Sequence, residues 1–393
     1  MNGVALRGVI AGTLIVAITV LPMTLCGVLI VQLSADLDLS NGGLGLLFAV
    51  FFASAALTSA SLGRFTERVG PRTALRIGAL AVGAASLTIA TVVRHWTALV
   101  AVIAVIGAGS ALTRPAAGLW IARVIPRDRQ GLAMGVNHTS VLVAMLAAGI
   151  ALPTVALRFG WRAAFLVAAV LAVLAVFSLP SRRGELRVGR AVDGDGAPGS
   201  PDQNLSRLTL AVLLVSAAFG TAGASSLGAF TVPTLISRGV GEVTAGLLVA
   251  VSSLMGLVSR VGVGVVADRR SSTGLFGTAV MILLGAGGFV MLGTPTTGWA
   301  IAGVLVAYST AWSWLGLFNL AMLRLNPRSP ASAIGTTQVG PFVGGVVGPL
   351  ALGGLVERFS FQFAWNFAAA LALVAATGVL AVHRHVVAPL ATA

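Results

Sequence analysis

Two arginines, Arg114 and Arg260, lie deep inside long apolar stretches of the chain. Arg114 lies in the stretch 97–122, about ten residues from its more basic end, and Arg260 lies about eight residues before Asp268. A charged side chain within such a stretch is costly and by default suggests a function. The planar guanidinium group suits a carboxylate or another planar oxyanion, because it can donate two parallel hydrogen bonds. The two arginines therefore predict an electropositive centre that an anion would neutralise.

Uncharged polar residues occur at similar positions in other apolar stretches. Asn137 and His138 lie together, Gln338 lies at a similar depth, and Asn319 is a little shallower. The amides suit two roles, contact with a ligand or hydrogen bonding between helices. His138 is either a proton carrier, since its ordinary pKa is about 6.5, or a neutral hydrogen-bonding side chain.

The elements that must position these side chains are membrane-spanning helices. Hydrophobic residues make up 57% of the 393, charged residues only 9%, and the mean hydropathy is +0.99, whereas a soluble domain is about one-quarter charged. A bilayer core of about 30 Å needs about 20 apolar residues per helix. We therefore expect an all-α polytopic membrane protein with twelve transmembrane helices, at 8–33, 41–63, 73–93, 97–122, 130–153, 161–180, 208–232, 242–266, 273–293, 298–322, 332–356 and 362–382.

The remaining arginines gather on one side of these spans. With the N-terminus inside, the outer segments hold only five of them, namely Arg94, Arg158, Arg162, Arg238 and Arg358. This asymmetry follows the positive-inside rule and predicts an inner-membrane protein with both termini in the cytoplasm. It accounts for the net charge of +14 without nucleic acid as a partner. The lone cysteine, Cys26, and the histidines form no metal-binding pattern, so no metal ion or cofactor is expected.

Two features of the spans predict how helices pack. The small-xxx-small spacing of glycines predicts close helix approach at Gly131/Gly135, Gly340/Gly344 and Gly344/Gly348. Aromatic residues of the spans 97–122 and 298–322 would form a wall beside the arginines, which favours an organic anion with an apolar part; they are Trp120, Tyr308, Trp312 and Trp314. Trp312 and Trp314 are two residues apart and cannot share one helix face, so at least one is expected to face lipid.

The chain repeats itself after a polar segment. Residues 181–207 are rich in Gly, Asp and Pro and predict a cytoplasmic linker between an N-terminal six-helix bundle at 1–180 and a C-terminal bundle at 208–393. The second bundle repeats the first at an offset of about 201 residues, so that Asn137 matches Gln338. Two such copies are typical of transporters that bind a substrate near the midplane between the halves.

Two loops in register carry the most specific motif. They read GRFTERVGPR, residues 63–72, and GVVADRR, residues 264–270. Both resemble the signature of the Major Facilitator Superfamily, Gly-xxx-Asp-Arg-x-Gly-x-Arg, although Glu67 replaces the usual Asp and Pro71 a usual basic residue. RFGWRAAF at 158–165, with a diverged copy at 357–367, adds to the resemblance. Together they cover essentially the whole chain and imply the fold of that superfamily, two pseudo-symmetric six-helix bundles.

The same resemblance implies a gating role for the two loops. The glycine would let neighbouring helices meet, and the acid at a helix end would pair with Arg or accept bonds from helix N-terminal N–H groups. Such a cluster can lock the cytoplasmic side in one state and release it in another. The expected gating residues are Gly63, Glu67, Arg68, Gly70, Arg72, Gly264, Asp268 and Arg269.

A narrower resemblance concerns Arg260. The segment SRVGVGVVADR, residues 259–269, resembles the eighth helix of oxalate/formate and monocarboxylate transporters, in which an arginine eight residues before the motif acid binds the carboxylate. The alternative is that Arg260 extends the charge cluster at the helix end and pairs with Asp268 or a terminal carbonyl. Arg114 has no counterpart in this resemblance, and Ser59 stands where nitrate transporters carry one of their paired arginines.

These patterns favour a secondary transporter of a small organic anion, coupled to protons or to a counter-anion. Its expected substrate contacts are Arg114, Arg260, Asn137, His138, Asn319, Gln338, Tyr308 and Trp312. The alternative is an exporter of drugs or of neutral or acidic metabolites with the same fold, in which the arginines are structural. An enzyme is not expected, because the acids lie at span ends or in loops and form no catalytic cluster. A channel is disfavoured by two repeats without a pore loop.

Overall fold

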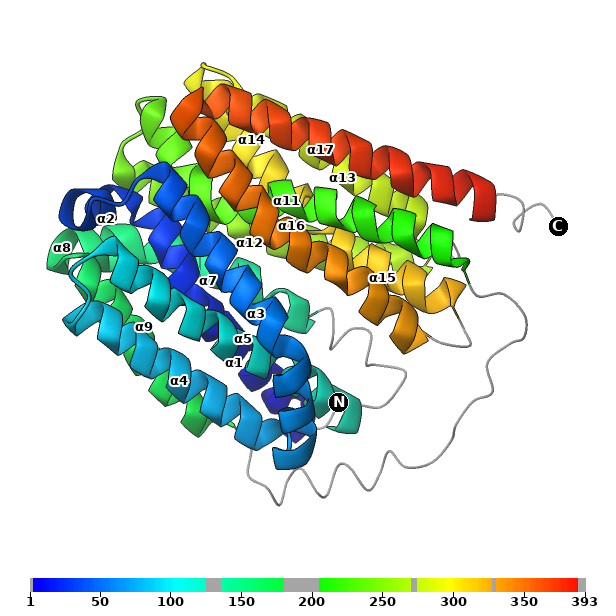
Figure 1. The fold of residues 1–393 in the computed structure, drawn as a ribbon, viewed down its shortest axis with the longest axis horizontal. Coiled ribbons are helices and arrows are strands. Elements are labelled where there is room, and N and C mark those ends of the chain that lie inside the picture. Colours follow the sequence, from blue (N-terminus) through cyan, green and yellow to red (C-terminus); the bar gives the residue numbers. More distant parts are fainter. Residues whose placement is uncertain (1–2, 125–135, 180–204, 270–273, 327–329, 388–393) are drawn as a thin grey trace. The chain divides into compact units, whose positions relative to one another are not determined.

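The computed structural model describes residues 3–124, 136–179, 205–269, 274–326 and 330–387, and every regular element within these ranges is helical (Figure 1). The helices include 12 that are long and apolar enough to cross a membrane, which confirms the predicted all-α fold with twelve spans. They are Gly8–Val28, Asn41–Ser59, Pro71–Thr91, Trp96–Ile121, Val136–Phe159, Trp161–Ser178, Arg207–Ser237, Glu242–Val266, Leu275–Gly293, Thr297–Met322, Thr337–Arg358 and Phe361–His385.

The chain divides into two compact units, and the first consists of Met1–Ser40 and Val50–Gly196. Its first helix, α1, packs against α4, α5, α7 and α9 and so forms the centre of the unit. Buried Ala, Leu, Ile and Val side chains of α1, α4, α5 and α9 form one apolar cluster. The elements of this unit are α1 (Gly3–Val28), α2 (Ile30–Leu37), α4 (Pro71–Thr91), α5 (Trp96–Val124), α7 (Ser140–Ala151), the π-helical turn η1 (Leu152–Ala156), α8 (Leu157–Phe159) and α9 (Trp161–Ser178).

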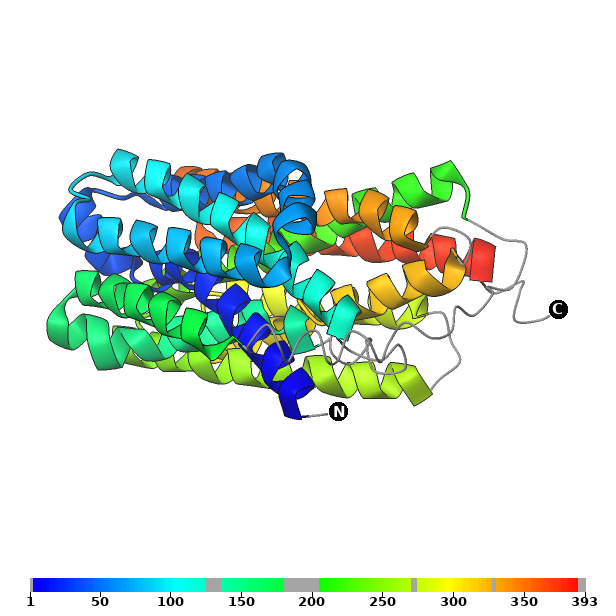
Figure 2. The ribbon, with the colours of Figure 1, turned by 90° about the horizontal axis from the view of Figure 1, so that it is seen from below.

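The second unit consists of Asn41–Ala49 and Ala197–Ala393, and it repeats the packing of the first. Helix α11 packs on α16 and α17 as α1 packs on α7 and α9, and α13 packs on α14 and α17 as α4 packs on α5 and α9. Within each unit the helices run side by side, as both views show (Figures 1 and 2). The helices are α11 (Arg207–Ser237), α12 (Glu242–Arg269), α13 (Leu275–Gly293), α14 (Thr297–Thr310), α15 (Trp314–Leu325), α16 (Pro330–Arg358), α17 (Phe361–Val382) and the π-helical turn η2 (His383–Val387).

One helix, α3 (Asn41–Val69), is shared between the units, because its first residues, Asn41–Ala49, group with the second unit. There the backbone N–H of Gly42 donates to Glu357 Oε1 at 2.7 Å. A Cβ on Gly42 would lie 2.6 Å from Glu357 Oε2, so the Glu357 side chain would have to shift if Gly42 were replaced. The predicted linker at 181–207 stays a prediction, since residues 180–204 lie outside the described ranges.

Glycines of α16 bring its backbone against α11. A Cβ on Gly340, Gly344 or Gly348 would fall against a carbonyl oxygen of α11, those of Leu214, Ala218 and Ala222 respectively. This confirms the close packing predicted from the spacing of these glycines. Gly131 and Gly135 lie outside the described residues.

Three spans are interrupted rather than continuous. The first predicted span, 8–33, is divided at Leu29, which separates α1 from α2. The fifth contains the π-turn η1, in which the N–H of Leu157 donates to Leu152 O, and Pro153 lies within this turn. The tenth is divided into α14 and α15 by a turn at Ala311–Ser313.

The expectation that Trp312 or Trp314 faces lipid is wrong. Their exposed fractions are 8% and 2%, so both rings are buried in protein. Trp314 packs against Gly220 of α11, where a Cβ would lie 3.1 Å from its ring, and edge-on against Phe318. Trp312 lies in the turn at Ala311–Ser313 and Trp314 begins α15, so the two residues do not lie on one continuous helix.

Candidate functional site

Arg114 lies on α5, directly before Pro115, and is partly buried. No residue in the described part of the chain forms a hydrogen bond or an ion pair with it. An arginine inside an apolar span without such a partner is costly. The guanidinium group is therefore available to an anion from outside the protein.

The amide of Asn137 is a second polar group in the first unit. Asn137 is only 8% exposed, and its Oδ1 atom is buried and has no hydrogen-bond partner among the described residues. A buried amide is normally bonded, so this atom requires an explanation. His138 beside it is partly buried and is engaged in an interaction within the protein.

The structure brings two predicted residues of the second unit together. Gln338 Nε2 of α16 donates to Asn319 Oδ1 of α15 at 2.9 Å. This contact matches the alternative in which such amides join helices. Arg260, on α12, is 7% exposed and is likewise engaged within the protein, so both of its predicted roles stay open.

Tyr308 and Trp312 differ in how their polar atoms are satisfied. Tyr308 is 1% exposed, and its hydroxyl donates to Leu227 O and Thr231 Oγ1 of α11, each at 3.4 Å. It lies eleven residues from Asn319, about 16 Å along the span, which separates it from the amide pair. Trp312 Nε1 is buried without a hydrogen-bond partner.

The first gating loop forms a tight corner between α3 and α4. Gly70 has a φ of 82°, a conformation that favours glycine, and Pro71 is the first residue of α4. The N–H of Gly70 donates to Thr66 O at 2.9 Å, and Gly70 O accepts from the N–H of Ala74 at 3.1 Å. These contacts fix where the two helices end and begin.

The predicted latch stays a prediction, because part of the second loop lies outside the described residues. Glu67 and Arg68 are exposed, and no ion pair joins Glu67 to another described residue, whereas Arg72 is partly buried and engaged. Nothing described lies within 4 Å of a Cβ built on Gly63 or Gly264. The side chains of Asp268 and Arg269 lie outside the described residues.

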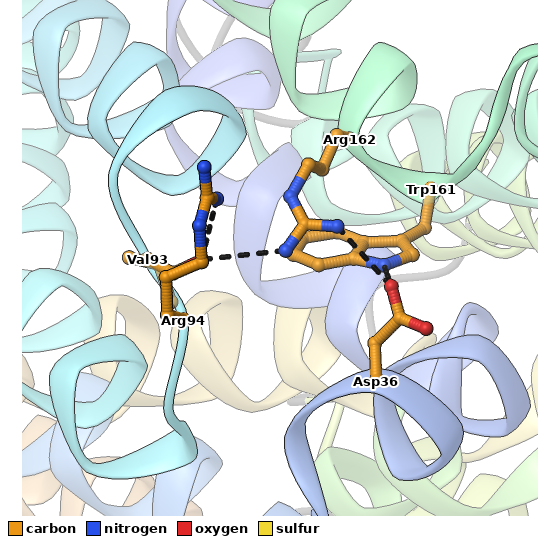
Figure 3. A network of polar contacts seen from close by, with 5 residues as sticks. All are labelled: Asp36, Val93, Arg94, Trp161 and Arg162. Atoms are coloured by element: carbon orange, nitrogen blue, oxygen red, sulfur yellow. Dashed lines mark hydrogen bonds and ion pairs between the residues drawn. The ribbon is translucent and has the colours of Figure 1, made fainter.

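A polar network that the sequence did not reveal lies in the first unit, where α2 meets the start of α9 (Figure 3). Asp36 Oδ2, on α2, accepts from Trp161 Nε1 at 2.7 Å and from an Arg162 guanidinium N–H at 3.1 Å. Arg162 also donates to Val93 O at 3.5 Å and lies 4.2 Å from the ring centre of Trp161 (Figure 3). The hydrogen bond from Trp161, and then Arg162, lower the pKa of the Asp36 carboxyl below its ordinary value. The network ties α2, the end of α4 and the start of α9 together.

The motif around this network was recognised only as a family resemblance. Trp161 and Arg162 belong to the segment RFGWRAAF. The signal available in the sequence is an acid just beyond the first span, because an acid in a chain with few charges is expected to pair with an arginine. Sequence spacing alone does not say which arginine that is.

Comparison with known proteins adds the family. The profile described as Major Facilitator Superfamily matches residues 12–349. A relative from Bacillus subtilis (strain 168), called the uncharacterized transporter YycB, is 26% identical over 356 residues, covering 89% of this chain and 86% of the relative. A crystal structure of a bacterial homologue of the human lysosomal transporter Spinster, inward-facing and occupied, has a TM-score of 0.71 at 16% identity and covers 98% of both chains. The fold thus agrees with the profile, and the chain belongs to the Major Facilitator Superfamily of transporters.

Proposed function

We propose that this transporter works by alternating access and moves a small organic anion, a carboxylate, across the inner membrane. The observation that carries the proposal is Arg114, a guanidinium group in a span that pairs with no described residue. The sequence places no Asp or Glu in the interior of a span, so a bound anion is the available counter-charge. Arg260 is proposed as a second contact, on the strength of its place before Asp268.

The coupling ion and the orientation are part of the same proposal. His138 is the proposed proton carrier if transport is proton-coupled, because no carboxyl group in a span competes for that task. Exchange against a counter-anion is the alternative coupling. The distribution of arginines supports an orientation with both termini in the cytoplasm.

Uptake of labelled carboxylates into proteoliposomes tests the proposal. We expect Arg114→Ala to lower uptake about tenfold or more, because charge-assisted hydrogen bonds are the stronger ones, and Arg114→Lys to retain part of it. Arg260→Ala is expected to lower uptake as well. Arg158→Ala, an exposed arginine on α8, is the matched control and should transport normally. Unchanged uptake in both Arg114→Ala and Arg260→Ala would end the proposal.

Export of uncharged or acidic compounds is the second candidate. The observation in its favour is Trp312 Nε1, a buried donor without an acceptor, which an uncharged compound carrying an acceptor oxygen would satisfy. Resistance profiles of cells with and without the gene separate the two candidates. Protection against neutral compounds, retained by Arg114→Ala, would favour export.

A further inference from the structure

The internal repeat predicts a partner for Asn137 that the first unit does not supply. The fourth and tenth spans, Trp96–Ile121 and Thr297–Met322, align at an offset of 201 residues, which places Gly118 opposite Asn319. The same offset places Asn137 opposite Gln338. In the second unit these two positions carry amides that bond to each other at 2.9 Å. In the first unit Gly118 has no side chain, and Asn137 Oδ1 is buried without a partner.

Arg114 lies on the same face of α5 as Gly118, the residue whose equivalent in the second unit contacts the equivalent of Asn137. It precedes Gly118 by four residues, and residues four apart share one face of a helix. In the second unit Asn319, the equivalent of Gly118, contacts Gln338, the equivalent of Asn137. By analogy with the second unit, we therefore expect the face of α5 that carries Arg114 to face Asn137.

Two hydrogen bonds to α1 place these groups at one depth. Thr19 Oγ1 lies 3.0 Å from Thr113 Oγ1, which puts Arg114, the next residue, level with the middle of α1. Thr24 Oγ1 donates to Ala144 O at 3.4 Å, and Asn137 precedes Ala144 by seven residues, about 10 Å. Asn137 is thus level with Ala17, near the centre of the span Gly8–Val28.

The hydrogen-bonding properties of the Arg114 guanidinium and the Asn137 amide indicate which ligand groups they would bind. The guanidinium of Arg114 only donates, and it suits a carboxylate. The amide of Asn137 donates or accepts, according to which way it is turned, and a hydroxyl group can meet either need. An ammonium group would add a cation beside Arg114 with no acid in the span interiors to balance it.

We propose that the first unit contains a subsite for a hydroxylated carboxylate, in which Arg114 binds the carboxylate and Asn137 binds the hydroxyl. The inference rests on the proposed function and narrows its substrate class. Gly118 sets the specificity, because a side-chain amide there would be able to donate to Asn137 Oδ1, at the place where Asn319 meets Gln338 in the second unit. A site built to hydrogen-bond a substrate hydroxyl rejects the analogue that lacks it.

Competition between glycolate and propionate tests the subsite, because these carboxylates differ chiefly in a hydroxyl in place of a methyl group. In proteoliposomes containing the full chain, we expect glycolate to be preferred about tenfold, the ratio that corresponds to one lost hydrogen bond of about 1.4 kcal/mol. Asn137→Ala should abolish the preference while propionate is still transported. Gly118→Asn should do the same, because it supplies the internal partner. Thr154→Ala, on the exposed side of the fifth span, should keep the wild-type preference.

The outcomes separate this inference from the proposed function. Equal transport of glycolate and propionate by the wild type, lost for both in Arg114→Ala, would overturn the hydroxyl subsite and leave anion transport standing; the amide would then be satisfied by water. Failure of every carboxylate in a panel would overturn both. The wild-type comparison needs no variant, and Gly118→Asn gives a second reading should Asn137→Ala fail to fold.

Discussion

Two charged side chains of the first unit differ in whether described residues pair with them. Asp36, outside the spans, is held by Trp161 and Arg162, whereas Arg114, inside a span, has no described partner. A charge near water needs little compensation, and a charge in a bilayer needs much. The fold thus compensates the charge that needs it less, and this contrast is why we assign Arg114 to a ligand and Asp36 to structure.

The network at Asp36 predicts a dependence of stability on pH. Because its pKa in the folded protein is lowered from 3.8, its contribution is present above that ordinary value and is lost as the pH falls through the lowered one. Asp36→Asn should therefore lower the unfolding temperature at pH 7 and remove part of the decline that the wild type shows below about pH 4. Thermal unfolding of the purified protein between pH 7 and pH 3 measures this.

Asp38→Asn provides the matched control for that measurement. Asp38 is exposed, lies two residues further on and has a φ of 54°, a conformation that asparagine also adopts readily. It should behave as the wild type does. Identical pH profiles for Asp36→Asn and the wild type would show that the network does not stabilise the folded state.

At the scale of single residues, sequence reasoning identified positions better than partners. Arg114, Asn137 and Gln338 stood out because polar groups in apolar spans are costly. Their different states, Gln338 bonded to Asn319 and Asn137 unbonded, depend on which helices pack together and on the missing side chain at Gly118. Such contacts join distant parts of the chain, and local spacing does not encode them.

At the scale of helices, glycine sets how closely α16 approaches α11. A Cβ at Gly344 would fall against the backbone oxygen of Ala218, whereas a Cβ at Gly354 on the same helix meets nothing described within 4 Å. Gly344→Ala should therefore destabilise the protein by about 1–3 kcal/mol through overpacking. Gly354→Ala should have little effect or stabilise the helix slightly, since alanine is the better helix former.

Denaturation of the two variants in detergent tests this packing. The expected result is a lower unfolding temperature for Gly344→Ala only. Equal unfolding temperatures for the two variants would mean that the backbone contact does not limit the approach of α16 to α11.

Breaker residues alone do not locate the interruptions of the helices. The π-turn in the fifth span contains Pro153, whereas Pro115 and Pro233 lie inside helices that continue past them. The turn at Ala311–Ser313 contains neither Gly nor Pro, and it separates Trp312 from Trp314, the first residue of α15. This is also why the outward-facing tryptophan expected from helix geometry is not found.

At the scale of the whole molecule, the apolar runs and the repeat predict most of the fold. Twelve spans follow from length and hydropathy, since a bilayer requires about 20 apolar residues per crossing. The repeated packing in the two units matches the repeat in the sequence. The repeat does not predict what happens where its two copies differ. The proposed subsite depends on one such difference, Gly118 in the first unit and Asn319 in the second.

The proposed orientation is testable because the native cysteine is unreactive. Cys26 has an exposed fraction of 0% and should give little background with a membrane-impermeant maleimide. In intact cells Arg158→Cys should react, and Arg384→Cys should react only after the membrane is opened; both positions are exposed. The reverse pattern would place the termini outside and contradict the charge argument.

Binding of carboxylates to the purified transporter tests the central claim most directly. A ligand stabilises the folded state by RT ln(1 + [L]/Kd), so a millimolar binder raises the unfolding temperature visibly at tens of millimolar. We predict that carboxylates raise the unfolding temperature of the wild type and of Arg158→Ala, and that the shift is lost in Arg114→Ala. An equal shift in Arg114→Ala, or no shift in the wild type with any carboxylate of the panel, would contradict the assignment of Arg114 to an anionic substrate.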